Sequence, residues 1–336
     1  MAEISNDKKV LKVALIGIGG MGGGHYNAYK NITGAKLVAV CDIRKEVAEE
    51  KTYEDIKSGA DIKIYTDYKK MIESETLDMV DIVTPSYLHA EIAEYCLDKG
   101  LNVLVEKPMA LSKKDCDEMI KHANKSGKKL MVAHVVRFMK PYMFLADTIK
   151  EGKYGKLISL DMRRVSSIPI WSYNDWMRDE KLSGGVCIDL AVHDIDFIQN
   201  LLGKPDKISS IYRPITNNSS FIKYNMIIDG VSVTGEGTWF NAYIPFSAEF
   251  LAVFENGYLE YKSGKLILNK SEVELEESKV NFGGLNISGD NAYANEIQYF
   301  INCVLDNKAP DFVSPESSEH SIELAKTILK KAEIIG

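Results

Sequence analysis

A lysine in the first half of the chain has a position suited to hydride-transfer chemistry. Lys107 belongs to Glu106-Lys107-Pro108, which follows an apolar, strand-like run over 102–105. In an open α/β sheet, ligands sit beyond the carboxyl ends of the strands. An ammonium there could hold a substrate hydroxyl and stabilise the charge that develops as a hydride leaves carbon. The alternative is a solvated surface lysine before a turn, and the motif alone leaves both interpretations open.

A histidine and an aspartate in the second half could exchange a proton with a substrate. Asp189 and His193 are four residues apart in a segment that we expect to be helical over 186–202, so they should share one helix face. A neutral histidine can accept the proton of an alcohol, and a nearby carboxylate can orient it. Gly184 and Gly185, just before, would permit close approach to another surface. The alternative is a buried helix with a hydrogen-bonded core histidine.

The first ordered stretch of the chain predicts a dinucleotide site. Residues 17–22 read G-I-G-G-M-G between an apolar run over 10–16 and a helical segment. Gly17 would permit the tight turn, Gly19 the approach of the pyrophosphate, and Gly22 the packing of helix on strand. A glycine-rich turn in another kind of α/β domain is the alternative, but the flanking strand, the helix and an acid 20 residues after Gly22 all agree with a dinucleotide.

That acid bears on the choice of cofactor. Asp42 ends the second strand, where a carboxylate can accept hydrogen bonds from the ribose hydroxyls and repel a 2′-phosphate. Arg44 could instead neutralise such a phosphate, stack on adenine or start the next helix. We therefore predict NAD, with NADP as the alternative.

The predicted cofactor contacts come from the glycine loop, the end of the second strand and the ends of two later strands. They are Gly17, Ile18, Gly19, Gly20, Met21, Gly22, Asp42, Ile43, Arg44, Thr84, Pro85, Ser86, His89, Glu106 and Lys107. His25 could also line this site, although either it or His89 could simply satisfy a backbone group.

Four further residues are predicted to contact the substrate. Arg137 follows the sixth strand and could bind an anion or a sugar hydroxyl. Arg164, Trp171 and Trp176 could line a polar pocket, because aromatic faces suit the C–H surfaces of sugars. The same residues could equally pack between subunits.

The elements that position these residues fall into two patterns. Six strands, the last over 130–136, alternate with helices and predict a parallel, doubly wound sheet. After residue 136 come strand-like runs separated by Asn217-Asn218, Asp229-Gly230, Asn256-Gly257 and Ser263-Gly264, which are hairpin signals. Helices over 292–305 and 317–335 close the chain. We predict an α/β protein with a dinucleotide-binding domain over 1–136 and an α+β domain with an open, mostly antiparallel sheet over 137–336.

Composition excludes several classes of function. The 336 residues carry a formal net charge of −7, which argues against general binding to nucleic acid or anionic membranes. No apolar run is long enough to span a bilayer, and the polar start lacks a secretory signal. Five scattered cysteines without C-x-x-C indicate a reducing cytoplasm, and the six histidines show no metal-binding spacing.

Taken together, the motifs resemble those of the glucose–fructose oxidoreductase and inositol dehydrogenase family, Gfo/Idh/MocA. The matching segments are GIGGMGGGH at 17–25, VCD at 40–42, TPSYLHAEIA at 84–93, VEKPMA at 105–110 and SGGVCIDLAVHDIDFIQNLLG at 183–203. The resemblance covers essentially the whole chain.

The resemblance implies a Rossmann domain followed by an α+β domain that often forms oligomer contacts. It also implies NAD(P)-dependent oxidation or reduction at a carbohydrate or cyclitol carbon, with Lys107, Asp189 and His193 matching the family's catalytic residues. We therefore expect a sugar or inositol dehydrogenase that is a homodimer or homotetramer. A glycosidase with transient oxidation by NAD, a sugar 3-oxidase or aldose–aldose oxidoreductase that recycles its cofactor, and a non-catalytic dinucleotide or sugar sensor are the alternatives.

Overall fold

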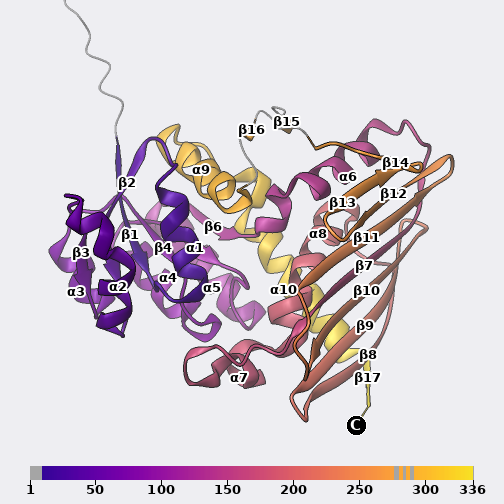
Figure 1. Cartoon of the computed structure of the whole chain (residues 1–336), viewed down its shortest axis with the longest axis horizontal. Coiled ribbons are helices and arrows are strands. Elements are labelled where there is room, and N and C mark those ends of the chain that lie inside the picture. Colours follow the sequence, from indigo (N-terminus) through magenta and orange to yellow (C-terminus); the bar gives the residue numbers. More distant parts are fainter. Residues whose placement is uncertain (1–9, 276–279, 283–284, 288–290, 336) are drawn as a thin grey trace, which may run out of the picture.

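The computed structural model describes residues 10–275, 280–282, 285–287 and 291–335. Within these residues the chain forms two large sheets that lie side by side, each with its own helices (Figure 1). A short two-stranded ribbon of β15 (Val280–Phe282) and β16 (Leu285–Ile287) forms a third, separate sheet.

The first sheet is parallel and doubly wound. Its strand order is β3-β2-β1-β4-β5-β6, so the order reverses between β1 and β4 and opens a crevice for a ligand at that point. The strands are β1 (Leu11–Ile16), β2 (Ala35–Cys41), β3 (Lys63–Tyr65), β4 (Met79–Ile82), β5 (Asn102–Glu106) and β6 (Leu130–Ala133). This arrangement confirms the predicted dinucleotide-binding fold.

Helices cover both faces of this sheet: α1 (Gly20–Tyr29), α2 (Lys45–Lys57), α3 (Tyr68–Ser74), α4 (His89–Asp98) and α5 (Lys113–Ser126). Local sequence sets their ends. The hydroxyl of Ser112 accepts a hydrogen bond from the amide of Asp115 at 3.1 Å, which caps α5, and Gly127 ends it in the left-handed conformation.

The second sheet is mixed, with strand order β14-β13-β12-β11-β7-β10-β9-β8-β17. Most neighbours are antiparallel, but β10 runs parallel to β7 and β17 parallel to β8. The four turn pairs expected from the sequence do join consecutive strands. The strands are β7 (Leu157–Ser167), β8 (Lys207–Thr216), β9 (Ser219–Ile228), β10 (Val231–Phe240), β11 (Ser247–Phe254), β12 (Gly257–Lys262), β13 (Lys265–Leu268), β14 (Ser271–Glu272) and β17 (Ala332–Ile334).

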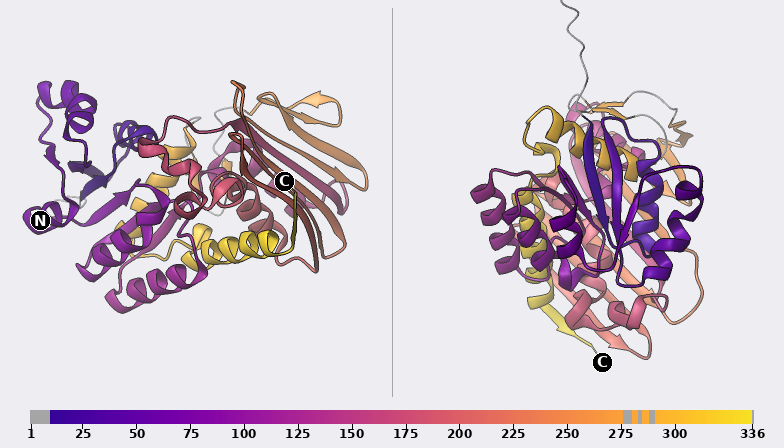
Figure 2. Two further views of the ribbon diagram at one scale, coloured as in Figure 1. Left: turned by 90° about the horizontal axis from the view of Figure 1, so that it is seen from below. Right: turned by 90° about the vertical axis from the view of Figure 1, so that its left-hand side faces the viewer.

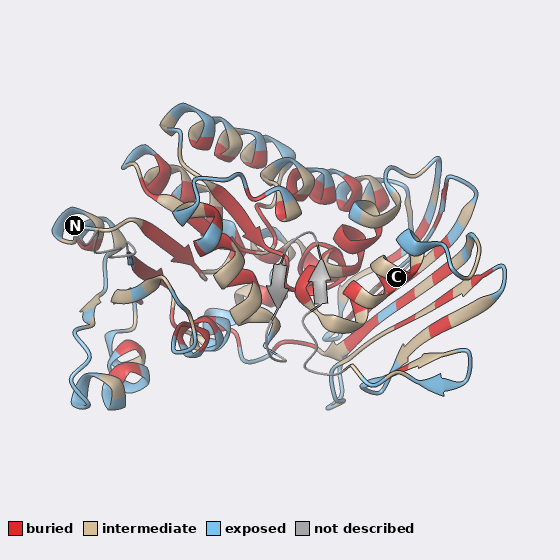
Figure 3. Cartoon of the chain, turned by 90° about the horizontal axis from the view of Figure 1, so that it is seen from above, coloured by how far each residue is buried: buried red, intermediate tan, exposed pale blue. Residues whose placement is uncertain are grey.

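Within the described residues, helices pack on one face of this second sheet. They are α6 (Lys140–Glu151), α8 (Val192–Leu202) and α10 (Pro315–Lys330). Along β9, residues alternate between buried and exposed, so one side of each strand faces the helices and the other stays open (Figure 3).

Three predicted boundaries are wrong. The sixth strand ends at Ala133 rather than residue 136, because the chain turns at His134 into a 3₁₀ turn, Val135–Phe138. The helix expected over 186–202 begins with a π-helical turn, Cys187–Ala191. The last helix ends at Lys330, since the following residues pair with the free edge of β8 instead of continuing the helix.

A helix from the end of the chain returns to the first domain. The helix α9 (Ala292–Leu305) packs against α1, beside it in Figure 1. Its Ile297, Phe300 and Ile301 join Leu11 and Val13 of β1 in one buried apolar cluster. The first sheet therefore depends on a segment almost 300 residues away for part of its core.

The glycine loop provides a matched pair of variants. A β-carbon on Gly22 would lie 2.1 Å from the carbonyl oxygen of Gly17, whereas one on Gly24 would meet no atom within 4 Å. We expect Gly22→Ala to lower the free energy of unfolding by about 1–3 kcal/mol through overpacking. Gly24→Ala should be neutral or stabilising by about 0.5–1 kcal/mol, because alanine favours a helix. Urea denaturation measures both, and equal stability of the two variants would contradict this packing.

Candidate active site

The turn from β1 into α1 is shaped so that only glycine fits at Gly17 and Gly22. Gly17 has a φ of +90°, and a β-carbon there would lie 2.3 Å from the carbonyl oxygen of Val83. At Gly19 a β-carbon would meet only the end of the Arg44 side chain, at 3.3 Å. No side chain caps the N-terminus of α1. The loop thus presents an accessible backbone and the positive end of a helix, which suit a pyrophosphate.

Asp42 lies at the end of β2 beside this loop, and its carboxylate is almost buried. It accepts hydrogen bonds from the backbone amide of Ile18 at 3.1 Å and from that of Arg44 at 3.0 Å. The side chain of Arg44 also donates to it from Nε at 3.3 Å. The carboxylate is therefore fixed where the ribose of a dinucleotide would lie, with oxygen lone pairs left to accept further bonds.

Both domains line one cavity of 830 Å³ at this crevice. Its wall includes fifteen of the residues predicted from the sequence: Gly17, Gly19, Gly20, Met21, Asp42, Ile43, Arg44, Thr84, Pro85, Ser86, Glu106, Lys107, Trp171, Trp176 and Asp189. The volume lies within the usual range for small-molecule sites. Predicted cofactor residues and two predicted substrate residues therefore share one space.

The second domain reaches over this cavity with the segment 168–183, which follows β7 (Figures 1 and 2). This strap contains the 3₁₀ turns of Tyr173–Arg178 and the short helix α7 (Glu180–Ser183). A ring carbon of Trp171 lies 3.4 Å from where a β-carbon on Gly20 would be. The ring of Tyr173 lies beneath the Arg44 guanidinium, 4.7 Å from centroid to carbon. Trp171 thus covers the glycine loop, next to the cofactor site.

Lys107 joins the two domains at the inner end of the cavity. Its Nζ donates a hydrogen bond to the backbone carbonyl of Asp189 at 2.9 Å and lies 3.4 Å from the carboxylate Oδ1. The lysine side chain is 16% exposed, so its ammonium is held mainly by these protein oxygens. The structure therefore brings together two residues that are 82 positions apart in the chain.

His193 sits differently from the sequence expectation. Its Nδ1 is buried and has no hydrogen-bond partner, so Asp189 does not orient that nitrogen. Asp189 lies in a π-helical turn, whose spacing is wider than the i, i+4 relation of a regular helix. The Asp189 carboxylate is directed at Lys107 instead. The carboxylate expected to orient His193 thus contacts Lys107, and the Nδ1 of His193 has no hydrogen-bond partner.

The surroundings of His193 keep its imidazole neutral. Burial lowers its pKa well below the ordinary value, and the positive charges of Lys107 and Arg164 lower it further. A neutral imidazole is the form that can accept a proton.

His89 links the turn after β4, at Thr84, to the segment after β5 that contains Lys107 and Pro108. The two ring nitrogens of this buried residue lie 2.8 Å from the carbonyl oxygen of Pro108 and 2.9 Å from that of Thr84. Burial lowers the pKa of His89, and the hydrogen bonds with the two backbone carbonyls oppose that effect. His89 shapes the wall of the cavity from behind, through Thr84 and Pro108.

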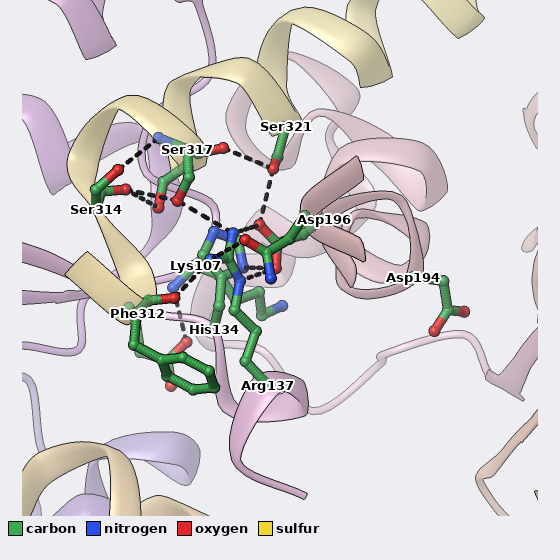
Figure 4. Close-up of polar contacts among 12 residues, drawn as sticks. Lys107, His134, Arg137, Asp194, Asp196, Phe312, Ser314, Ser317 and Ser321 are labelled. Carbon is green, nitrogen blue, oxygen red and sulfur yellow. Dashed lines mark hydrogen bonds and ion pairs between the residues drawn. The ribbon is translucent and has the colours of Figure 1, made fainter. Parts of the chain in front are cut away.

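Arg137, predicted as a substrate contact, is instead the centre of a buried polar cluster (Figure 4). Its guanidinium forms a double ion pair with Asp196, at 2.8 and 2.7 Å. The remaining N–H groups donate to Asn200, the carbonyl of Phe312 and Ser317. With its donors engaged by protein groups and 2% of its surface exposed, Arg137 acts within the fold.

Arg164 is also buried and ion-paired. It donates to both carboxylate oxygens of Asp194, at 3.2 and 2.6 Å, and to the hydroxyl of Tyr142. Its charge still reaches His193, whose pKa it lowers. We therefore place Arg164 behind His193 rather than in direct contact with a substrate.

Sequence reasoning missed Tyr173 and His134. Tyr173 lies between two predicted tryptophans, so the aromatic content of that segment was its only signal. His134 is buried 3.4 Å from Asp196, and burial lowers its pKa to about 4. Its position at the end of β6, next to the site, could have been noticed from the strand pattern.

The glycine loop, the start of α1 and Asp42 together fit a bound NAD molecule. The glycines leave room at the turn, the start of α1 has no side-chain cap, and Asp42 offers a fixed carboxylate. The described residues contain no group of histidine, cysteine and carboxylate side chains that could hold a metal ion. None of the helices described is long and apolar enough to cross a membrane.

Comparison with known families agrees with this fit. Residues 11–134 match the model of the oxidoreductase family with an NAD-binding Rossmann fold, and residues 142–265 match the GFO/IDH/MocA C-terminal domain. The chain belongs to the Gfo/Idh/MocA family. The resemblance predicted from the motifs is thereby confirmed, and the first domain is an NAD-binding domain.

Several characterised relatives are similar to parts or all of the chain. It is 29% identical over 204 residues to 2,7-anhydro-N-acetylneuraminate hydratase of Mediterraneibacter gnavus, covering 60% of this chain and 52% of the relative. It is 28% identical to inositol 2-dehydrogenase of Salmonella typhimurium, covering 61% and 58%. Both matches thus span little more than half of the relative. The crystal structure of myo-inositol 2-dehydrogenase from Lactobacillus plantarum is 26% identical, with a TM-score of 0.78 over 96% and 97% of the chains.

Proposed function

We propose that the protein transfers a hydride between NAD and a hydroxyl-bearing carbon of a sugar, sugar derivative or cyclitol. The observation that carries this proposal is the meeting of Lys107 and Asp189 at the wall of the cavity that also contains the glycine loop and Asp42. A neutral histidine stands close enough for the lysine charge to lower its pKa. These groups are those that alcohol oxidation beside a nicotinamide needs.

In this proposal each side chain has a separate task. His193 takes the proton of the substrate hydroxyl, for which its neutral form is required. Lys107 holds the same oxygen with its ammonium, and Asp189 fixes the direction of that ammonium. When bound, NAD accepts the hydride. Burial and the strap over the cavity limit the access of water, which strengthens these interactions.

Similarity to inositol 2-dehydrogenases supports a polyol as substrate. The matching family model, which is described as NAD-binding, supports NAD as the cofactor. Arg44 adds to the argument for NAD. Its Nε is held by Asp42 and its face lies on Tyr173, so its charge is partly compensated. A 2′-phosphate would have to displace one of these contacts and face the Asp42 carboxylate.

A second candidate activity leaves no net oxidation. One of the similar relatives is a hydratase. A reaction in which the substrate is oxidised, altered and reduced again would suit a cofactor enclosed by the strap. The same site would then serve a hydratase or glycosidase. In each turnover the reduced cofactor would return the hydride to the substrate.

The catalytic assignments can be tested with Lys107→Met and His193→Ala. With an active polyol, inositol or aldose, each substitution should lower kcat by about 10²–10⁴-fold, because each removes a group that acts in the transition state. The Kd for NAD, from quenching of protein fluorescence, should change little. Absorbance of the reduced cofactor follows the dehydrogenase reaction, and product analysis without net reduction detects the hydratase or glycosidase reaction.

The contrary outcome is a turnover close to that of the unmodified protein in either variant. Lys99→Met, at a surface position after α4, serves as the matched control and should leave kcat unchanged.

The pH dependence of alcohol oxidation follows from His193. Because its pKa lies well below 6.5, the base is already neutral at pH 6.5, and kcat/KM should not fall as the pH decreases through that value. Lys107→Met removes a neighbouring positive charge, so the pKa of His193 should rise and the acid limb of the profile should move to higher pH. An acid limb that stays in place would show that Lys107 does not act on this histidine.

We also propose a cytoplasmic homodimer or homotetramer that pairs through the open face of the second sheet. All five cysteines are free and buried, as expected in a reducing compartment. The open face is hollowed and carries charges of both signs, including Arg163, Lys223, Glu236 and Glu249. Such a face can be self-complementary about a two-fold axis. Light scattering should give a mass at least twice that of the chain, and Lys223→Glu should reduce it; a monomeric wild-type protein would contradict the proposal.

A further inference from the structure

A buried histidine that the catalytic proposal does not use lies directly behind Lys107. His25 of α1 is fully buried, and its two ring nitrogens meet carboxylates on two different strands. The Nδ1 donates to Asp81 of β4 at 2.9 Å, and the Nε2 donates to Glu106 of β5 at 3.0 Å. Both nitrogens can donate only when the imidazole carries two protons.

The charged and titratable groups on the elements around His25 favour its protonated form. Burial alone would lower its pKa, but the carboxylates of Asp81 and Glu106 outweigh burial and raise it well above the ordinary value. Glu296 and Tyr293 of α9 also face this cluster. Burial raises the pKa of both, which disfavours their negatively charged forms. Burial likewise raises the pKa of Tyr29, on α1 itself.

Glu106 connects this histidine to the lysine. One of its oxygens accepts the Nε2 proton of His25, and the other accepts a hydrogen bond from the backbone amide of Lys107 at 2.9 Å. An unbroken series of contacts therefore runs from Asp81 through His25 and Glu106 to the backbone of Lys107. Beyond it, the lysine Nζ reaches Asp189 of the second domain.

We propose that His25 is a positioning residue for Lys107 and acts through Glu106. His25 bridges two carboxylates that would otherwise repel each other in a water-free site, and it fixes the direction of the Glu106 side chain. Glu106 in turn fixes the backbone at Lys107, and thus where the ammonium lies relative to the cavity. This proposal rests on the proposed function only for the role of Lys107 in turnover.

The placement of Lys107 can be measured without any substrate. In His25→Gln, Glu106 loses its charged partner, and the contact between Lys107 and Asp189 should loosen. Acetylation of Lys107 by acetic anhydride, followed by mass spectrometry and scaled to the exposed Lys36, should become several-fold faster. His122→Gln is the matched control. It removes a histidine–aspartate contact of 2.9 Å at the surface, with Asp98, and should leave the labelling of Lys107 unchanged.

Turnover supplies a second measurement that a purely structural role would not move. If Lys107 is displaced, kcat should fall by about 10–10²-fold, since misplacement of a catalytic group by an ångström has that effect. The affinity for NAD should remain, because the glycine loop and Asp42 are untouched. Faster labelling without any turnover in the wild-type protein would uphold His25 as a positioning residue while refuting the proposed reaction.

A double-mutant cycle tests that His25 acts through Glu106. Glu106→Gln and the combination with His25→Gln should each give labelling and kcat close to those of His25→Gln alone, because both remove the same link. Independent, multiplying effects would overturn the proposal, as would unchanged labelling and kcat in His25→Gln. Should His25→Gln not fold, Asp81→Asn removes the far end of the same series and must speed Lys107 labelling; unchanged labelling there would equally overturn it.

Discussion

The site depends on one contact between domains, the hydrogen bond from the Lys107 ammonium to the backbone carbonyl of Asp189. A lysine that is mostly withdrawn from water needs protein oxygens around it, because its charge is costly to bury alone. The first domain presents the lysine at the end of β5, and the second presents the oxygens in a π-helical turn. Neither domain alone contains both partners, so the arrangement exists only while the two are packed together.

Around this contact, the molecule uses buried charge in two distinct ways. Arg137 with Asp196 and Arg164 with Asp194 are closed pairs, in which the charges are matched and directed at each other. His25 with Asp81 and Glu106 leaves one negative charge in excess, and that excess lies beside Lys107. The closed pairs hold helices α8 and α10 against their neighbours, whereas the unbalanced cluster is joined through Glu106 to the backbone of Lys107.

Local features of the sequence were sufficient to predict much of this structure. Gly17 and Gly22 mark their turn by themselves, and the hairpin pairs such as Asp229-Gly230 specify their turns without help from distant residues. The burial and ion pairing of Arg137 could not be predicted, because its partners lie 59 to 180 residues further along the chain. The π-helical turn at Asp189 could not be predicted either, because the periodicity of apolar residues was interpreted as that of a regular α-helix. Placement of Lys107, Asp189 and His193 near one another follows from the structure, while their catalytic roles stay predictions.

The return of α9 to the first sheet has a consequence for the modularity of the chain. Phe300 and Ile301 complete the apolar cluster around Leu11 and Val13, and Glu296 from the same helix is fully buried beside His25. A recombination event that exchanged everything after the sixth strand would thus replace part of the core of the nucleotide-binding domain as well. An exchange that preserves this core must therefore keep α9 together with the first domain, and not only match at the domain junction.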